Sequence, residues 1–100
     1  MIVAIGIVAR AARRALQELR SAGLRVGLFR PVTLWPFPED ALREAAAKAR
    51  CVLVPEMNAG QLALEVERIV GPKRVARLNR IDGEPITPND IVRRVREIAA

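Results

Sequence analysis

Two hydrophobic periodicities alternate along the chain. Short apolar runs rich in β-branched residues are typical of buried strands, whereas apolar residues spaced three and four apart predict amphipathic helices. The predicted strands are 2–8, 26–29, 51–54 and 75–78. The predicted helices are 9–22, a segment beginning near 39, 61–70, and a last one beginning after Thr87. This alternation predicts one α/β domain over residues 1–100, with three α/β/α layers and a largely parallel sheet of four to five strands.

Residues that typically start or end helices support several of these boundaries. Gly23 stands where a glycine commonly ends a helix, so the first helix should stop there. The clearest start precedes the last helix, where Thr87 suits the N-cap and Pro88 the first helical position. Asp90 then completes a predicted capping box with Thr87.

The charge is positive and dominated by arginine. The net charge is +6, from 15 Arg and 2 Lys against 11 acidic residues. A basic domain can bind nucleic acid, a membrane surface or an acidic protein. The arginines are spread along the chain, which favours a solvated surface with ion-pair networks suited to high temperature.

Missing residue types exclude several kinds of chemistry. The chain has no histidine, no tyrosine and a single cysteine, Cys51. A His-based triad and an iron–sulfur cluster held by this chain alone are therefore excluded, and an oxidising compartment is not implied. The longest apolar run, 1–9, is too short to span a bilayer and lacks the flanks of a signal peptide. We expect a cytoplasmic protein without membrane partners.

Ligands of open α/β sheets usually lie beyond the carboxyl ends of the strands. Three predicted loops should meet there, namely 6–10, 30–38 and 55–61. The first has one glycine where a dinucleotide fingerprint needs three, and the chain contains no phosphate-binding lysine motif. Nucleotide binding by this chain is therefore not expected.

All three aromatic residues of the chain lie within nine residues, in or directly before the loop 30–38. They are Phe29, Trp35 and Phe37, and the segment Trp35-Pro36-Phe37-Pro38 is stiff, large and apolar. One interpretation is a lid over the core beneath the second helix. The other is a docking patch, because Trp and Phe anchors dominate interface energetics.

The loop 55–61 gathers polar side chains at the end of a strand. Glu56 could act as a general base, pair with an arginine such as Arg30, or form structural hydrogen bonds with its surroundings. A single carboxylate is a weak indication of catalysis, so we favour the hydrogen-bonding role. Cys51 is expected to be a small core residue.

Three separated motifs resemble a known family. RPVTLWPFP at 30–38, EMNAGQ at 56–61 and GEPITP at 83–88 resemble the C-terminal part of the α subunit of 2-oxoacid:ferredoxin oxidoreductases, most of all the 2-oxoglutarate type. The resemblance covers essentially the whole chain. It implies a fold like the C-terminal domain of transketolase, whose sheet is mixed and contains one antiparallel strand.

The resemblance also implies a function in a larger enzyme. The complete enzyme converts a 2-oxoacid and coenzyme A to acyl-CoA and CO₂, using thiamine diphosphate and iron–sulfur clusters and reducing ferredoxin. This chain is expected to bind none of these cofactors, to be inactive alone, and to contact the pyrimidine-binding and pyrophosphate-binding parts, with a homodimer left open. The expected interface or binding edge consists of Arg30, Thr33, Trp35, Phe37, Glu56, Asn58 and Gln61.

Two details depart from the family pattern. Family members often have Gly-Ser-Val-Ala after the first strand, where this chain has Ile7 in place of the serine and loses any polar contact of that side chain. The chain also begins almost on its first strand, which suggests an excised domain or a separately encoded piece without the pyrimidine-binding domain.

Two other functions are compatible with the sequence. A free-standing module that binds a ligand such as coenzyme A is the main alternative, motivated by Arg30, Glu56, Asn58 and Gln61 at the strand ends. A nucleic-acid binder is disfavoured because the basic residues are not interleaved with an aromatic platform.

Overall fold

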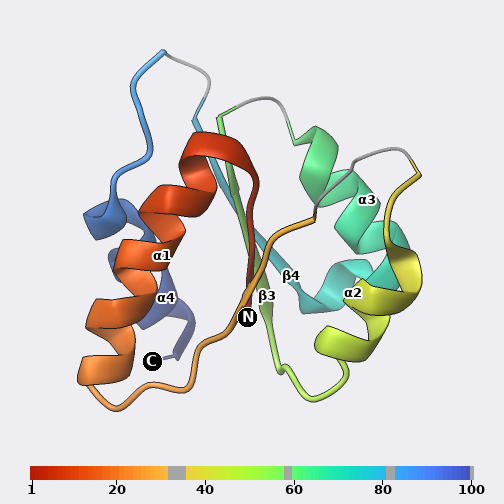
Figure 1. The fold of residues 1–100 in the computed structure, drawn as a ribbon, viewed down its shortest axis with the longest axis horizontal. Coiled ribbons are helices and arrows are strands. Elements are labelled where there is room, and N and C mark those ends of the chain that lie inside the picture. The colour runs from red at the N-terminus through yellow and green to blue at the C-terminus, as the bar shows by residue number, and fades with distance from the viewer. Residues whose placement is uncertain (32–35, 58–59, 81–82, 100) are drawn as a thin grey trace.

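A parallel sheet of four strands forms the centre of the molecule, in the order β2-β1-β3-β4 (Figure 1). The structure is a computed structural model that describes residues 1–31, 36–57, 60–80 and 83–99. The strands are β1 (Ile2–Val3), β2 (Leu28–Phe29), β3 (Val52–Glu56) and β4 (Val75–Asn79). The longest ladder joins β3 to β4, from Val52 opposite Val75 to Glu56 opposite Asn79.

Two pairs of helices cover the two faces of this sheet (Figure 1). α1 (Gly6–Ser21) lies against α4 (Pro88–Ala99) on one face, and α2 (Glu39–Ala45) lies with α3 (Gln61–Val70) on the other. A short 3-10 turn, η1 (Pro72–Arg74), leads from α3 into β4. None of the described helices has both the length and the apolar character that crossing a membrane requires. The three-layer α/β/α architecture predicted from the periodicities is confirmed.

Each face of the sheet has its own hydrophobic core. Side chains of a strand point alternately to opposite faces, so Leu53 packs in the core beneath α1 and α4, whereas Val52 and Val54 pack in the core beneath α2 and α3. β1 divides Ile2 and Val3 in the same way. All five side chains are at most 2% exposed, which explains why these strands are apolar at every position.

The first strand is much shorter than predicted. β1 ends at Val3, and α1 begins at Gly6 rather than near residue 9. Gly6 has a φ of +57°, a left-handed conformation that suits glycine, and Val8 and Ala9 are then buried on the inner face of the helix. The apolar run 2–8 fits a strand or a buried helix equally well, so its periodicity alone could not place the boundary.

The third strand is longer than predicted and includes Pro55 and Glu56. Backbone groups of a parallel strand alternate between its two neighbours. The amide of Leu53 donates to the carbonyl of Met1, directly before β1, over 2.8 Å. The nitrogen of Pro55 therefore also faces the β1 side, where the recorded pairing of β1 with β3 is at Leu53. Proline at this place removes no hydrogen bond from the ladder with β4.

The predicted helix ends are confirmed at two places. The Thr87 amide donates to Asp90 Oδ2 at 2.9 Å, and the Asp90 amide donates to Thr87 Oγ1 at 3.1 Å, which completes the capping box. At the end of α1, Gly23 has a φ of +88°, and the amide of Leu24 donates to the Leu19 carbonyl at 3.0 Å. This is the glycine-dependent helix stop that the sequence predicted.

The direction of the strands differs from the mixed sheet that the resemblance implied. Every strand pairing among the described residues is parallel. The predicted sheet had four to five largely parallel strands, and the described sheet has four strands that are all parallel. No antiparallel strand is present in the described parts of the chain.

Candidate functional site

The carboxyl ends of the four strands meet at one edge of the sheet, at the top of Figure 1. Parallel strands bring the segments that follow them to this edge, as the sequence predicted. The predicted site residues that the structure describes are Arg30, Phe37, Glu56 and Gln61, while Thr33, Trp35 and Asn58 lie outside the described residues.

Glu56 is the buried centre of this edge, with only 3% of its surface exposed. Its two carboxylate oxygens accept hydrogen bonds from the first amides of α3, from Leu62 at 3.0 Å and from Ala63 at 2.9 Å. Such bonds are charge-assisted, and a negative charge is favourable at the positive end of a helix. The predicted hydrogen-bonding role of Glu56 is confirmed, and among the described residues it forms no ion pair with Arg30.

Gly60 lies directly before α3 and close to the Arg77 side chain. It has a φ of +102°, and a Cβ at this position would lie 2.7 Å from Nη1 of Arg77. The Arg77 guanidinium is itself held by Glu67, which accepts from Nε and Nη2 at 2.8 Å each. A side chain at residue 60 would therefore meet both backbone strain and an anchored arginine. This contact was not predicted from the sequence, although a glycine directly before a helix is a signal for it.

The other described site residues differ in how far they are buried. Arg30 is exposed after β2, and Gln61 is exposed as the first residue of α3. Phe37 is only 8% exposed and packs in the core beneath α2 and α3. Its burial favours the core-lid interpretation for this aromatic residue over a free docking anchor.

A second polar link joins the end of β4 to the start of α4. Arg80 Nη1 lies 3.3 Å from Asp90 Oδ2, the same oxygen that caps the helix. The pKa of Asp90 is held below its ordinary value, first by the hydrogen bond from the Thr87 backbone amide and then by the Thr87 side chain and the nearby Arg80 and Arg93. The start of α4 is thereby held to the carboxyl edge of the sheet.

Two apolar side chains are exposed near the polar ones on this edge. Ile7, at the start of α1, is 73% exposed, and Met57, directly after β3, is 38% exposed. Single exposed apolar residues are ordinary, but two beside the strand ends suit contact with another protein surface.

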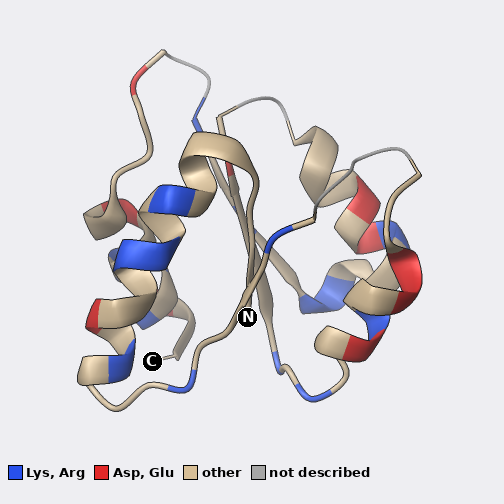
Figure 2. Cartoon of the chain, viewed as in Figure 1, with Lys and Arg blue, Asp and Glu red and all other residues tan. Residues whose placement is uncertain are grey.

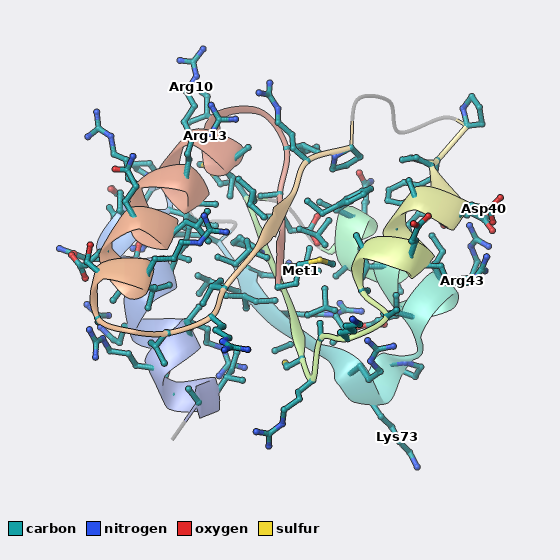
Figure 3. The ribbon with its side chains drawn as sticks, turned by 60° about the horizontal axis from the view of Figure 1, so that its bottom comes forward. Met1, Arg10, Arg13, Asp40, Arg43 and Lys73 are labelled. Carbon is teal, nitrogen blue, oxygen red and sulfur yellow. The ribbon has the colours of Figure 1, made fainter. Side chains whose placement is uncertain are left out.

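The two helical layers carry opposite charge (Figure 2). α1 and α4 contain seven arginines against three acidic residues, whereas α2 and α3 contain five acidic residues against two arginines. On the α2/α3 side, Arg68 bridges Glu39 at 2.6 Å and Glu65 at 2.9 Å. On the other side, Arg10 and Arg13 extend outward from α1 (Figure 3). The helices of one layer are therefore net basic, and those of the other are net acidic although most of their carboxylates are ion-paired.

The described part of the carboxyl edge offers hydrogen bonding and apolar contact rather than proton transfer. Its one buried carboxylate already accepts two backbone hydrogen bonds. The described residues contain no group of three or more His, Cys, Asp or Glu side chains that could hold a metal ion. This arrangement fits a rigid, positioned surface better than a reaction centre.

The chain is similar in sequence to one family of oxidoreductase subunits. Residues 1–91 match the family model described as pyruvate:ferredoxin oxidoreductase core domain II. The chain is 39% identical over 99 residues to ketoisovalerate oxidoreductase subunit VorB of Methanothermobacter marburgensis, covering 99% of the chain and 28% of the relative. It is 40% identical over 96 residues to 2-oxoglutarate synthase subunit KorA of Methanocaldococcus jannaschii. This match covers 95% of the chain and 26% of the relative. The chain thus spans about a quarter of the length of these curated relatives.

Solved structures show the same fold inside larger proteins. The chain superposes with a TM-score of 0.87 and 34% identity on a 2-oxoglutarate:ferredoxin oxidoreductase from Magnetococcus marinus, solved with 2-oxoglutarate, coenzyme A and succinyl-CoA bound, covering 96% of this chain and 17% of that one. It also superposes on a split-gene transketolase, an inactive β4 tetramer, with a TM-score of 0.81 over 96% of this chain and 36% of that one. At 23% identity, the second likeness concerns the fold alone.

Proposed function

Because the chain belongs to the pyruvate:ferredoxin oxidoreductase core domain II family, we propose that it is a supporting domain of a thiamine-diphosphate-dependent 2-oxoacid:ferredoxin oxidoreductase. The observation that carries the proposal is the match of residues 1–91 to this family model. Identities of 39% to a VorB subunit and 40% to a KorA subunit support it. In the proposed reaction, a 2-oxoacid and coenzyme A give acyl-CoA and CO₂, and the released electrons pass to ferredoxin.

The residues of this chain do not fit the cofactors of that reaction. An iron–sulfur cluster is held by several thiolates, and the sequence contains one cysteine. The described residues contain neither a metal-binding group of side chains nor a glycine-rich loop before α1 that could approach a diphosphate. The proposal therefore assigns thiamine diphosphate, the clusters and coenzyme A to other parts of the assembly.

The proposed role of this chain is to support and contact those parts through its carboxyl edge. Glu56 holds the start of α3 through two backbone hydrogen bonds, and Gly60 leaves room beside it for the Arg77 guanidinium. Arg30, Gln61 and the apolar Ile7 are exposed there. We place the pyrimidine-binding and pyrophosphate-binding parts as the partners of this edge, with the complete enzyme in the cytoplasm.

The proposal is tested by activity that depends on assembly. The chain alone should neither decarboxylate 2-oxoglutarate or 2-oxoisovalerate nor bind thiamine diphosphate. Mixed with the remaining subunits of the enzyme, it should support reduction of ferredoxin that requires both the 2-oxoacid and coenzyme A. Decarboxylation by the isolated chain, or full activity of the other subunits without it, would contradict the proposal.

A free-standing module that binds coenzyme A remains the second candidate. The structural relative from Magnetococcus marinus was solved with coenzyme A bound, and Arg30 is an exposed cation at the strand ends of this chain. Calorimetry with coenzyme A separates the two functions. Heat of binding to the isolated chain, abolished by Arg30→Ala, would favour the binding module, and no heat at millimolar coenzyme A would exclude it.

A further inference from the structure

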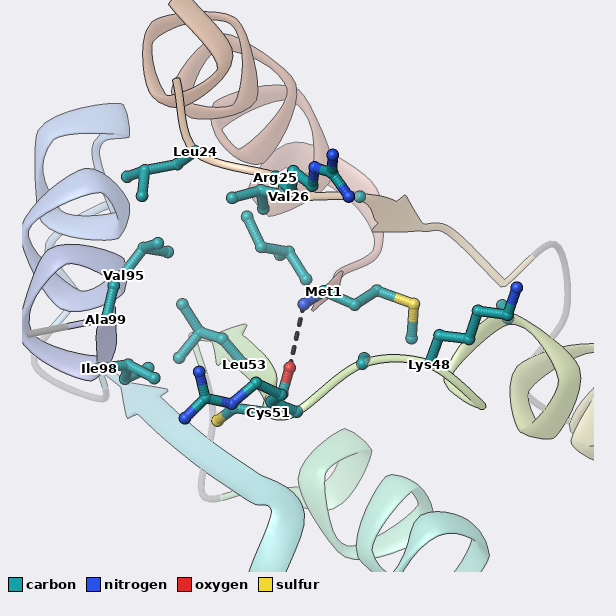
Figure 4. Close-up of a pocket in the computed structure, with 15 residues that line it drawn as sticks. Met1, Leu24, Arg25, Val26, Lys48, Cys51, Leu53, Val95, Ile98 and Ala99 are labelled. Carbon is teal, nitrogen blue, oxygen red and sulfur yellow. Dashed lines mark hydrogen bonds between the residues drawn. The ribbon is translucent and has the colours of Figure 1, made fainter. Parts of the chain in front are cut away.

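A groove of about 650 Å³ lies at the opposite, amino edge of the sheet, where the strands begin (Figure 4). Its apolar lining comes from three elements that are far apart in the sequence. The side chains are Leu24 and Val26 before β2, Leu53 in β3, and Val95 and Ile98 in α4. All except Leu53 are only partly buried, although they pack against the core beneath α1 and α4. The folded chain thus leaves an apolar floor open at this edge.

Three basic side chains lie around this apolar floor, with no acidic side chain among the lining residues. Arg25, Lys48 and Arg50 line the groove and are exposed. Within the described parts of the chain, none of the three has an ion-pair partner. By contrast, Arg68 on the α2/α3 side is shared between two carboxylates. The groove therefore combines uncompensated positive charge with exposed apolar surface.

We propose that this groove receives an acidic segment of a neighbouring subunit of the oxidoreductase, with aliphatic side chains on the floor and carboxylates against Arg25, Lys48 and Arg50. The proposal rests on the proposed function, which supplies the neighbouring subunit. Charge complementarity is the feature that selects such a partner, because positive rims recruit and orient acidic surfaces. The apolar floor supplies the buried contact that charge alone does not.

Other occupants fit the groove less well. The groove is lined by no aromatic side chain on which bases could stack, which disfavours single-stranded nucleic acid. A second copy of the chain would have to offer a group of unpaired carboxylates, but four of the five acidic residues of its α2 and α3 helices are engaged with arginines, which leaves Glu44 alone. An acidic segment of a different chain meets neither objection.

The single cysteine of the chain provides a reporter for this groove. Cys51 lines it and is partly exposed, and its carbonyl accepts a hydrogen bond from the amino group of Met1 at 3.0 Å (Figure 4). A maleimide reagent should therefore label the free chain at one site. When the chain is assembled with the remaining subunits, the labelling rate should fall to less than about a tenth, because a filled interface excludes solvent.

Charge reversal on the groove and away from it separates the proposed contact from general attraction. Arg25→Glu/Lys48→Glu reverses the rim, and Arg10→Glu/Arg13→Glu makes the same change of charge on the exposed face of α1. All four residues are exposed, and circular dichroism checks that both variants fold. The rim variant should bind the remaining subunits about tenfold or more weakly, and the α1 variant should bind nearly as the wild type does.

Each outcome decides the proposal. Equal weakening by the two variants would show unspecific attraction, including attraction to nucleic acid, and would overturn it. An active complex in which Cys51 reacts as in the free chain, and in which the rim variant binds normally, would also overturn it while leaving the proposed function intact. If the wild-type chain does not assemble with the remaining subunits at all, the proposed function and the groove proposal both fail.

Discussion

At the scale of single residues, Glu56 acts as the cap of a helix that begins five residues later. The N-cap position of α3 is occupied by Gly60, which has no side chain to accept from the helix amides. The sequence placed Glu56 at a strand end and favoured a hydrogen-bonding role. It could not identify Leu62 and Ala63 as the donors, because their position beside Glu56 depends on how α3 packs against the sheet.

Replacing Glu56 should therefore cost stability. Glu56→Ala leaves two buried amides without their acceptor and should lower the free energy of unfolding by about 3 kcal/mol. Urea denaturation followed by circular dichroism measures the change, provided that the slope with urea stays constant. The matched control is Glu44→Ala on the exposed side of α2, which should change stability by less than about 0.5 kcal/mol. Equal losses for the two variants would contradict the capping role.

At the scale of elements, the sequence predicted the interiors of helices better than the ends of strands. The helix 61–70 was predicted with the bounds it has, because its apolar spacing is regular and Gly71-Pro72 follows it. β1 was predicted too long because residues 2–8 are apolar at every position, so only Gly6 marks the change from strand to helix. Pro55 was predicted in a loop because the neighbours that make proline tolerable in β3 are set by strand order.

The capping box of α4 should make stability depend on pH. A carboxyl whose pKa is lowered in the folded state stabilises the fold above its ordinary pKa, which is 3.8 for Asp90, and this contribution is lost as the pH falls through the folded-state pKa. Asp90→Asn should therefore be less stable than the wild type at neutral pH, and the difference should shrink toward about pH 3. Thermal or urea unfolding at both pH values measures it. A difference that stays constant with pH would contradict a role for the Asp90 charge.

At the scale of the whole molecule, one sheet joins two cores. β1 and β3 place alternate side chains in each core, so neither core can loosen without disturbing the strands of the other. The layers and the family could be predicted from the sequence, because periodicity and the three motifs are local, and the family is confirmed by the match of residues 1–91. The strand order and the burial of Phe37 could not, because both depend on contacts between distant segments.

Cavities made in either core should lower the same unfolding transition. Ile91→Ala empties part of the core beneath α1 and α4, and Leu42→Ala empties part of the core beneath α2 and α3; both side chains are fully buried. Each should cost about 3 kcal/mol and leave a single calorimetric transition at a lower temperature. Two separate transitions in either variant would show that the cores unfold independently.

The unequal charge of the two helical layers gives the molecule an electric dipole moment directed across its sheet, from one layer to the other. A distant acidic surface attracts the net basic α1/α4 helices and repels the net acidic α2/α3 helices. The resulting torque turns the chain while it is still diffusing, before any side chain makes contact. At physiological salt this torque acts over about 8 Å, so ionic strength controls how often an encounter begins in the right orientation.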